Sequence, residues 1–150
     1  YKRLRLGASL SGTTWAPAYL AQGPNNRTAA LRTLHGRFEW RVPDSSTNPY
    51  LATAALIIAG LDGVDRKLEP PPECTDDLFE LSPAQIRERG IPLLPQSLSE
   101  ALDALAADEL ICTGLGATLA EEFLHLKRAE AAEYQQQVSD WELQRYAEAF

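Results

Sequence analysis

The chain has 150 residues, a length that suits one domain with a hydrophobic core. Its hydrophobic fraction is 45% and its charged fraction 23%, as in an ordinary soluble globular protein. The longest apolar run, "YLATAALIIAGL", is shorter than the roughly 20 residues that a membrane helix needs, so we expect no membrane partner. The chain begins with Tyr1 and contains no Met, so we expect it to be part of a longer protein.

The charge is distributed unevenly along the chain. Residues 1–41 carry seven Lys or Arg and one acid, Glu39, whereas the acids prevail in the remainder and bring the net charge to −7. A basic block in an acidic protein favours a local anion site over a nucleic-acid surface, which would need a broad basic face. Chance clustering on a solvated surface explains the charge count equally well.

Cys74 and Cys112 are the two cysteines, and their separation matches no metal-binding or redox motif. This usage favours a reduced, cytoplasmic setting, with a single disulfide as the open alternative.

The amino-terminal part of the chain predicts loops and then a hairpin. Gly, Pro and Asn recur in residues 1–27, where we expect loops and short extended pieces. The stretches 28–34 and 37–43 predict two strands joined by a turn at His35 and Gly36. Two strands form no stable sheet unaided, so the hairpin needs strands that this chain lacks or strands of another copy.

A helix is predicted over residues 48–63, "NPYLATAALIIAGLDG". Asn48 suits the N-cap, Pro49 suits the first turn, and Gly60 or Gly63 could end the helix. Apolar residues cover most of its circumference, so we expect it to be buried.

The carboxy-terminal half predicts helices near 83–89, 97–106, 118–135 and 140–148. Each has a Ser or Thr followed three residues later by Glu or Gln, the pattern of a capping box. The four pairs are Ser82 with Gln85, Ser97 with Glu100, Thr118 with Glu121, and Ser139 with Glu142.

The second predicted strand places Arg37, Glu39 and Arg41 on one face, because side chains alternate between faces along a strand. An exposed charged ladder would explain this pattern. However, each base is Arg, whose planar fork matches phosphates and carboxylates, and Arg27 and Arg32 lie on the neighbouring segment. The pattern therefore also indicates a phosphate site in which Glu39 holds a metal ion.

Five stretches carry a family resemblance: "YKRL" at 1–4, "AP" at 16–17, "NNRTAALR" at 25–32, "RFEWRVPD" at 37–44 and "NPYLATAALIIAGLDG" at 48–63. In this order they resemble the carboxy-terminal catalytic part of the glutamine synthetase family. The resemblance implies an α+β fold, with strands of an antiparallel half-barrel sheet followed by a helical region. It divides the chain into site-forming strands and loops (1–47), a buried helix (48–65) and a helical region (66–150), with the amino-terminal domain outside the chain.

The resemblance also implies an activity. Members join glutamate to ammonia or an amine through γ-glutamyl phosphate, with ATP as co-substrate and Mg²⁺ or Mn²⁺ as cofactor. It implies a cytoplasmic homo-oligomer, of dodecameric stacked rings, with active sites between neighbouring subunits. We therefore expect these 150 residues alone to be inactive.

Site residues carry over by position. Arg3, Arg27 and Arg41 are implied to bind the substrate glutamate, with Arg27 and Arg41 also acting in catalysis. Binding of ATP is implied for Arg27 together with two further arginines, Arg32 and Arg37.

Glu39 resembles a carboxylate ligand of the metal that bridges the nucleotide phosphates, and Asp44 and Asn48 are expected to shape the turn and cap the helix.

Trp15 stands where ordinary glutamine synthetases have the Glu that deprotonates ammonium. An indole accepts no proton, and its apolar face favours an alkyl group, as in the γ-glutamylmethylamide synthetase-like branch. We therefore expect an amine such as methylamine, although Trp15 could simply pack. Other open alternatives are an ordinary glutamine synthetase using ammonia, an inactive structural homologue, and a generic anion-binding module.

Overall fold

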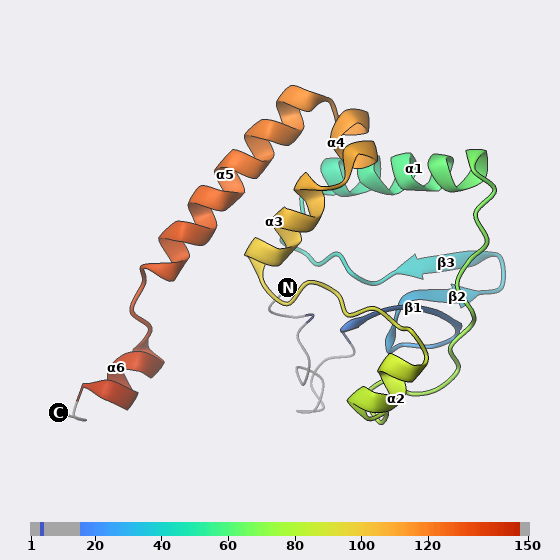
Figure 1. Cartoon of the computed structure of the whole chain (residues 1–150), viewed down its shortest axis with the longest axis horizontal. Coiled ribbons are helices and arrows are strands. Elements are labelled where there is room, and N and C mark those ends of the chain that lie inside the picture. Colours follow the sequence, from blue (N-terminus) through green and yellow to red (C-terminus); the bar gives the residue numbers. More distant parts are fainter. Residues whose placement is uncertain (1–3, 5–15, 148–150) are drawn as a thin grey trace.

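The computed structural model describes residue 4 and residues 16–147, and its first elements form a small mixed sheet (Figure 1). The strands are β1 Tyr19–Pro24, β2 Ala29–Leu34 and β3 Arg37–Trp40, in the order β1-β2-β3. The β2–β3 hairpin is confirmed: the two strands are antiparallel, and Gly36 adopts a φ of 74° in the turn. β1, however, pairs with β2 in parallel, so the sheet is not wholly antiparallel.

β1 provides a third strand that the sequence analysis assigned to loops and short extended pieces. Later segments of the same chain cover its outer edge. The backbone N–H of Leu20 donates to the carbonyl of Pro92 at 2.8 Å, and the N–H of Cys74 donates to the carbonyl of Gln22 at 2.8 Å. On this side the hairpin therefore finds its partners within the chain, contrary to the expectation that they lie elsewhere.

The hydrophobic core lies between this sheet and residues 74–91. Helix α2, Pro83–Glu88, contributes Ile86, which is 3% exposed. The capping box of α2 is confirmed, with Ser82 and Gln85 each bonding the other's backbone. The buried residues of this core are Ala18, Tyr19, Ala21, Ala29, Cys74, Leu78 and Ile86.

Helix α1, Pro49–Asp65, begins as predicted and ends later than predicted. The side chain of Asn48 caps it by accepting hydrogen bonds from the N–H groups of Tyr50 and Leu51. Gly60 and Gly63 lie inside the helix, which continues to Asp65.

The prediction that α1 is buried fails within this chain. None of its residues is buried, and Ile57 and Leu61 are 55% and 59% exposed. The physical reason is that, among the described elements, only α4 packs against it to any extent, so most of its apolar circumference is left uncovered. Burial of α1 against further polypeptide stays a prediction.

The remaining helices extend away from the sheet (Figure 1). They are α3 Leu98–Ala106, α4 Glu109–Leu115, α5 Ala117–Gln135 and α6 Asp140–Tyr146. α3, α4 and α5 pack against one another. α4 was not predicted; its N-cap is Asp108, whose carboxylate accepts from the N–H of Ile111 at 3.0 Å.

The three other predicted capping boxes have three different outcomes. The box of Ser139 and Glu142 is complete. Ser97 caps α3, but the carboxylate of Glu100 accepts from the N–H of Gln96, one residue earlier than predicted. The box at Thr118 is wrong, because α5 has no side-chain cap and already begins at Ala117.

The cysteines and the apolar character of the helices can both be checked over the described residues. Cys74 and Cys112 are both free thiols, which excludes the alternative of a disulfide between them. Within residues 16–147, no helix combines the length and apolar character that crossing a membrane requires.

Candidate active site on the hairpin face

The hairpin register brings the predicted charged residues together on one face of the sheet. Arg32 on β2 lies directly opposite Glu39 on β3, and Arg37 lies two residues before Glu39 on the same face. Pairing continues past the end of β3, where the N–H of Arg41 donates to the carbonyl of Ala30 at 2.9 Å. The alternation expected from the sequence therefore holds through Arg41.

Glu39 forms an ion pair at the centre of this face. Its Oε2 lies 3.0 Å and its Oε1 3.3 Å from Nη1 of Arg32. Nη2 of Arg37 lies 3.9 Å from Oε1, on a side chain that is 66% exposed. The Arg32 side chain is 16% exposed, so it is the more firmly enclosed of the two partners.

Arg32 is held at both ends of its guanidinium group. Nη1 bonds Glu39, and Nη2 donates to Oδ1 of Asn25 in the turn between β1 and β2. Its Nε is buried and has no hydrogen-bond partner among the described residues. In this arrangement Arg32 orients Glu39, and its implied role as an ATP ligand stays a prediction.

The surrounding arginines lower the pKa of Glu39 below its ordinary value of 4.5. The largest cause is the hydrogen bond from Arg32, with the charges of Arg32, Arg37 and Arg41 acting in the same direction, while desolvation opposes them. Glu39 is therefore an ionised carboxylate at neutral pH.

Arg27 joins this group through its backbone. The Nη1 atom of Arg41 donates to the carbonyl oxygen of Arg27, so the guanidinium of Arg41 lies at the turn that carries Arg27. Arg27 itself is exposed. The structure thus connects Arg27, Arg32, Arg37, Glu39 and Arg41, whereas Arg3 and Trp15 lie outside the described residues.

Asp44 and Asn48 have the structural roles expected for them. Oδ1 of Asp44 accepts from the N–H of Ser46 at 2.9 Å and from its hydroxyl at 2.6 Å. These bonds form the turn that leads from the charged strand to α1, which Asn48 caps.

Sequence analysis missed two polar residues beside the site, Asn26 and Thr28. They flank Arg27, and both are buried, at 9% and 2% exposure. The signal was present in "NNRT", since a buried Asn in a turn must find partners for its whole amide.

The arrangement fits an anion and one contact to a hard cation. Arginines exceed acids on this face, and their guanidinium groups suit phosphate and carboxylate oxygens. The ionised Glu39 offers an oxygen of the kind that Mg²⁺ and Mn²⁺ prefer. Among the described residues, no group of three or more His, Cys, Asp or Glu gathers, and the role of Glu39 as a metal ligand stays a prediction.

Comparisons with known proteins identify the family of the chain. The family model for the glutamine synthetase catalytic domain matches residues 1–146. A glutamate–methylamine ligase of Methyloversatilis universalis is 53% identical over 150 residues, covering 100% of this chain and 34% of that protein. A glutamine synthetase of Halobacterium salinarum is 41% identical over 100% of this chain and 33% of its own length.

A glutamine synthetase of Thermotoga maritima is 37% identical over 97% of this chain. The chain therefore belongs to the glutamine synthetase family and matches its catalytic domain. The α+β fold expected from the resemblance is confirmed. The chain spans about a third of the length of these relatives.

Proposed function

We propose that this chain carries the arginine-rich part of the active site of an ATP-dependent ligase, which joins the γ-carboxylate of glutamate to an amine such as methylamine. The observation that carries the proposal is the hairpin face, where Arg32, Arg37 and Arg41 surround one ionised carboxylate, Glu39. Membership of the glutamine synthetase family supports the reaction class.

The reaction has two steps. An oxygen of the glutamate γ-carboxylate attacks the γ-phosphorus of ATP, and ADP leaves. The nitrogen of the amine then attacks the acyl carbon of γ-glutamyl phosphate, inorganic phosphate leaves, and the nitrogen loses a proton. Both steps gather negative charge on phosphate oxygens, so positioning and charge neutralisation are the main needs of the reaction.

The arginines meet these needs. Arg27 and Arg41, linked through the Arg27 carbonyl, would hold glutamate and the transferring phosphoryl group. Arg32 and Arg37, together with Arg27, would neutralise the ATP phosphates, and Arg3 would hold glutamate. Glu39 would contribute one oxygen to a bound Mg²⁺ or Mn²⁺ ion, which offsets phosphate charge when present.

An amine is favoured over ammonia as the second substrate. Trp15 replaces a proton-accepting Glu in the corresponding motif and offers an apolar surface for an alkyl group. The relative named for methylamine is 53% identical to the chain, against 41% for the glutamine synthetase of Halobacterium. The second candidate is ordinary glutamine synthesis, which the names of the latter and other relatives favour.

The proposal includes the assembly and location of the protein. We propose a cytoplasmic homo-oligomer of dodecameric stacked rings, with each active site shared between neighbouring subunits.

The full-length protein tests the choice of amine. Initial rates with ATP and glutamate should be compared at equal concentrations of methylammonium and ammonium. We expect a higher kcat/KM for methylammonium, with formation of γ-glutamylmethylamide. A clear preference for ammonium would replace the amine ligase by the second candidate.

A third candidate, a catalytically inactive homologue, requires a separate test. Glu39→Ala in the full-length protein should abolish metal-dependent turnover, because the face loses its ionised carboxylate. Glu69→Ala, at an exposed acid in the loop after α1, is the matched control and should retain turnover. Absence of turnover in the unmodified protein with either amine would favour the inactive homologue.

A further inference from the structure

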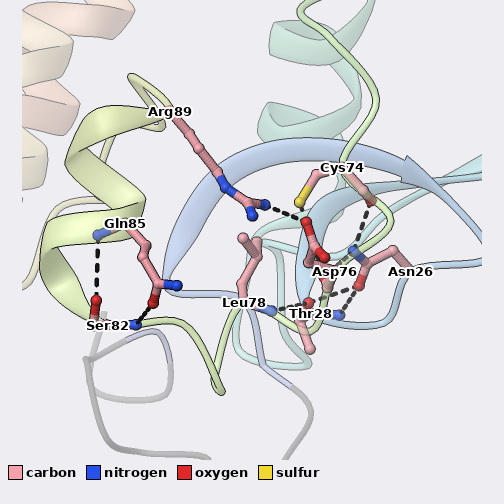
Figure 2. Close-up of polar contacts among 8 residues, drawn as sticks. All are labelled: Asn26, Thr28, Cys74, Asp76, Leu78, Ser82, Gln85 and Arg89. Carbon is pink, nitrogen blue, oxygen red and sulfur yellow. Dashed lines mark hydrogen bonds and ion pairs between the residues drawn. The ribbon is translucent and has the colours of Figure 1, made fainter.

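A single buried amide organises the turn on which Arg27 lies (Figure 2). Oδ1 of Asn26 accepts from the N–H of Thr28 at 2.9 Å and from its hydroxyl at 2.6 Å. Nδ2 of Asn26 donates to the carbonyls of Cys74 at 2.8 Å and Asp76 at 2.9 Å. Two donors and two acceptors are the full capacity of an Asn side chain, so the amide has no hydrogen bond left to form.

Thr28 extends this network to the same distant segment. Its hydroxyl oxygen accepts from the N–H of Leu78 at 3.1 Å, in addition to donating to Asn26. Leu78 is 1% exposed and belongs to the hydrophobic core. Asn26 and Thr28 therefore bind the turn to residues 74–78, and we call these two residues the turn clamp.

Residues 74–78 are themselves fixed against the sheet and α2. The carbonyl oxygen of Cys74 approaches so closely that a Cβ at Gly23 would lie 2.0 Å from it. On the other side, the guanidinium of Arg89 pairs with the carboxylate of Asp76 (Figure 2). The turn clamp is therefore attached to a part of the chain that cannot easily shift.

Arg27 lies between the two clamp residues, and its backbone carbonyl accepts a further hydrogen bond from Arg41. Its neighbours Asn26 and Thr28 are buried and fully bonded. Unlike these two neighbours, Arg27 is exposed at the surface of the turn. Arg27 is therefore an exposed residue whose backbone is fixed by the hydrogen bonds of Asn26 before it and Thr28 after it.

We propose that Asn26 and Thr28 are positioning residues of the ligase, which hold the backbone of Arg27 so that its guanidinium meets the phosphoryl group. This inference rests on the proposed function, since it gives a purpose to the fixed backbone of Arg27. The clamp acts through Arg27 and touches no substrate. Pre-positioning matters because small displacements of a charged group strongly weaken its contribution to a transition state.

Three variants of the full-length protein test the clamp. Thr28→Val keeps the shape of the side chain but removes the hydroxyl, leaving the N–H of Leu78 without its acceptor. Thr28→Ser removes the methyl group but keeps the hydroxyl. Thr118→Val makes the same chemical change at an exposed position in the first turn of α5 and is the matched control.

We expect Thr28→Val to lower kcat/KM about tenfold or more, by analogy with other displacements of positioned groups. Thr28→Ser and Thr118→Val should stay within about twofold of the unmodified protein, a difference of roughly 0.4 kcal/mol or less. If Thr28→Val does not fold, Thr28→Ala replaces it with the same expected loss, because it removes the hydroxyl without placing a methyl group against the N–H of Leu78.

A double-mutant cycle separates positioning from a general loss of stability. In the background of Arg27→Ala, Thr28→Val should change the affinity for ATP, measured by equilibrium dialysis, far less than it does in the unmodified protein. An undiminished effect in that background would overturn the inference, as would unchanged kcat/KM in folded Thr28→Val. Failure of the unmodified protein to turn over glutamate with either amine would instead overturn the proposed function.

Discussion

Arg32 and Glu39 face each other across the hairpin, with Nη1 of Arg32 3.0 Å from Oε2 of Glu39. Arg32 also reaches Asn25 with its second terminal nitrogen, so one side chain links the ladder to the preceding turn. This pairing makes Arg32 the main determinant of where the Glu39 carboxylate lies.

Arg32→Lys should lower the midpoint of thermal unfolding more than Arg37→Lys does. Lys offers one ammonium group in place of a planar fork, so it cannot hold Glu39 and Asn25 together. Arg37 is largely exposed and lies 3.9 Å from Glu39, where replacement by another cation loses little. Scanning calorimetry of the two variants provides the measurement. Equal shifts in midpoint would contradict the role given to Arg32.

The lowered pKa of Glu39 predicts a dependence of stability on pH. Because the folded-state pKa lies below 4.5, the ionised carboxylate stabilises the folded state above that value, and this contribution is lost as pH falls through the folded-state pKa. The difference in urea midpoint between the unmodified protein and Glu39→Gln should therefore be constant from pH 5 upward, about the range of full ionisation, and shrink at lower pH. If the difference in urea midpoint instead grew on acidification, the pKa of Glu39 would not be lowered by folding.

Gly23→Ala should destabilise the protein by about 3 kcal/mol, at the upper end of the usual overpacking range. The new Cβ would lie 2.0 Å from the carbonyl oxygen of Cys74, and backbone must move to accommodate it. Gly36→Ala is the comparison: its Cβ meets nothing within 4 Å, and only its φ of 74° is unfavourable. Urea denaturation should place Gly36→Ala between Gly23→Ala and the unmodified protein.

Ser82→Ala should destabilise the protein by about 1 kcal/mol, the usual effect of removing an N-cap. The hydroxyl of Ser82 accepts from the N–H of Gln85, and α2 carries the core residue Ile86. Thr118→Ala should not destabilise the protein, because Thr118 lies inside α5 and caps nothing. Chemical denaturation of both variants distinguishes a true cap from a sequence match.

Local signals in the sequence predicted the hairpin and the starts of several helices. Gly36 marks a turn that requires a positive φ, and alternation on β3 places Arg37 and Glu39 on one face. Asn48 and Ser82 cap helices through bonds that span only two or three residues. Such features need no knowledge of distant parts of the chain.

Features that depend on distant contacts escaped prediction. β1 contains Gly23 and Pro24, which favour turns, yet it pairs because the later segment around Cys74 lies along its edge. Asn26 and Thr28 likewise find partners about 50 residues away, at Asp76 and Leu78. No local pattern specifies which carbonyl a buried amide will meet.

The capping pattern failed to predict where two helices, α4 and α5, begin. The Ser/Thr capping pattern does not include Asp108, whose carboxylate caps α4. It also assigned Thr118 as a cap, whereas Gly116, with a φ of 94°, precedes the first residue of α5. The short stretch between α4 and α5 leaves room for only one turn, and its glycine takes that position.

The proximity of Arg27, Arg32, Arg37 and Arg41 also has an energetic consequence. These four cations share one hairpin and one turn, so their mutual repulsion raises the free energy of the folded chain. A bound polyanion relieves that repulsion, and ligands that bind only the folded state stabilise it. A phosphate compound bound as proposed would therefore raise the resistance of this protein to heat.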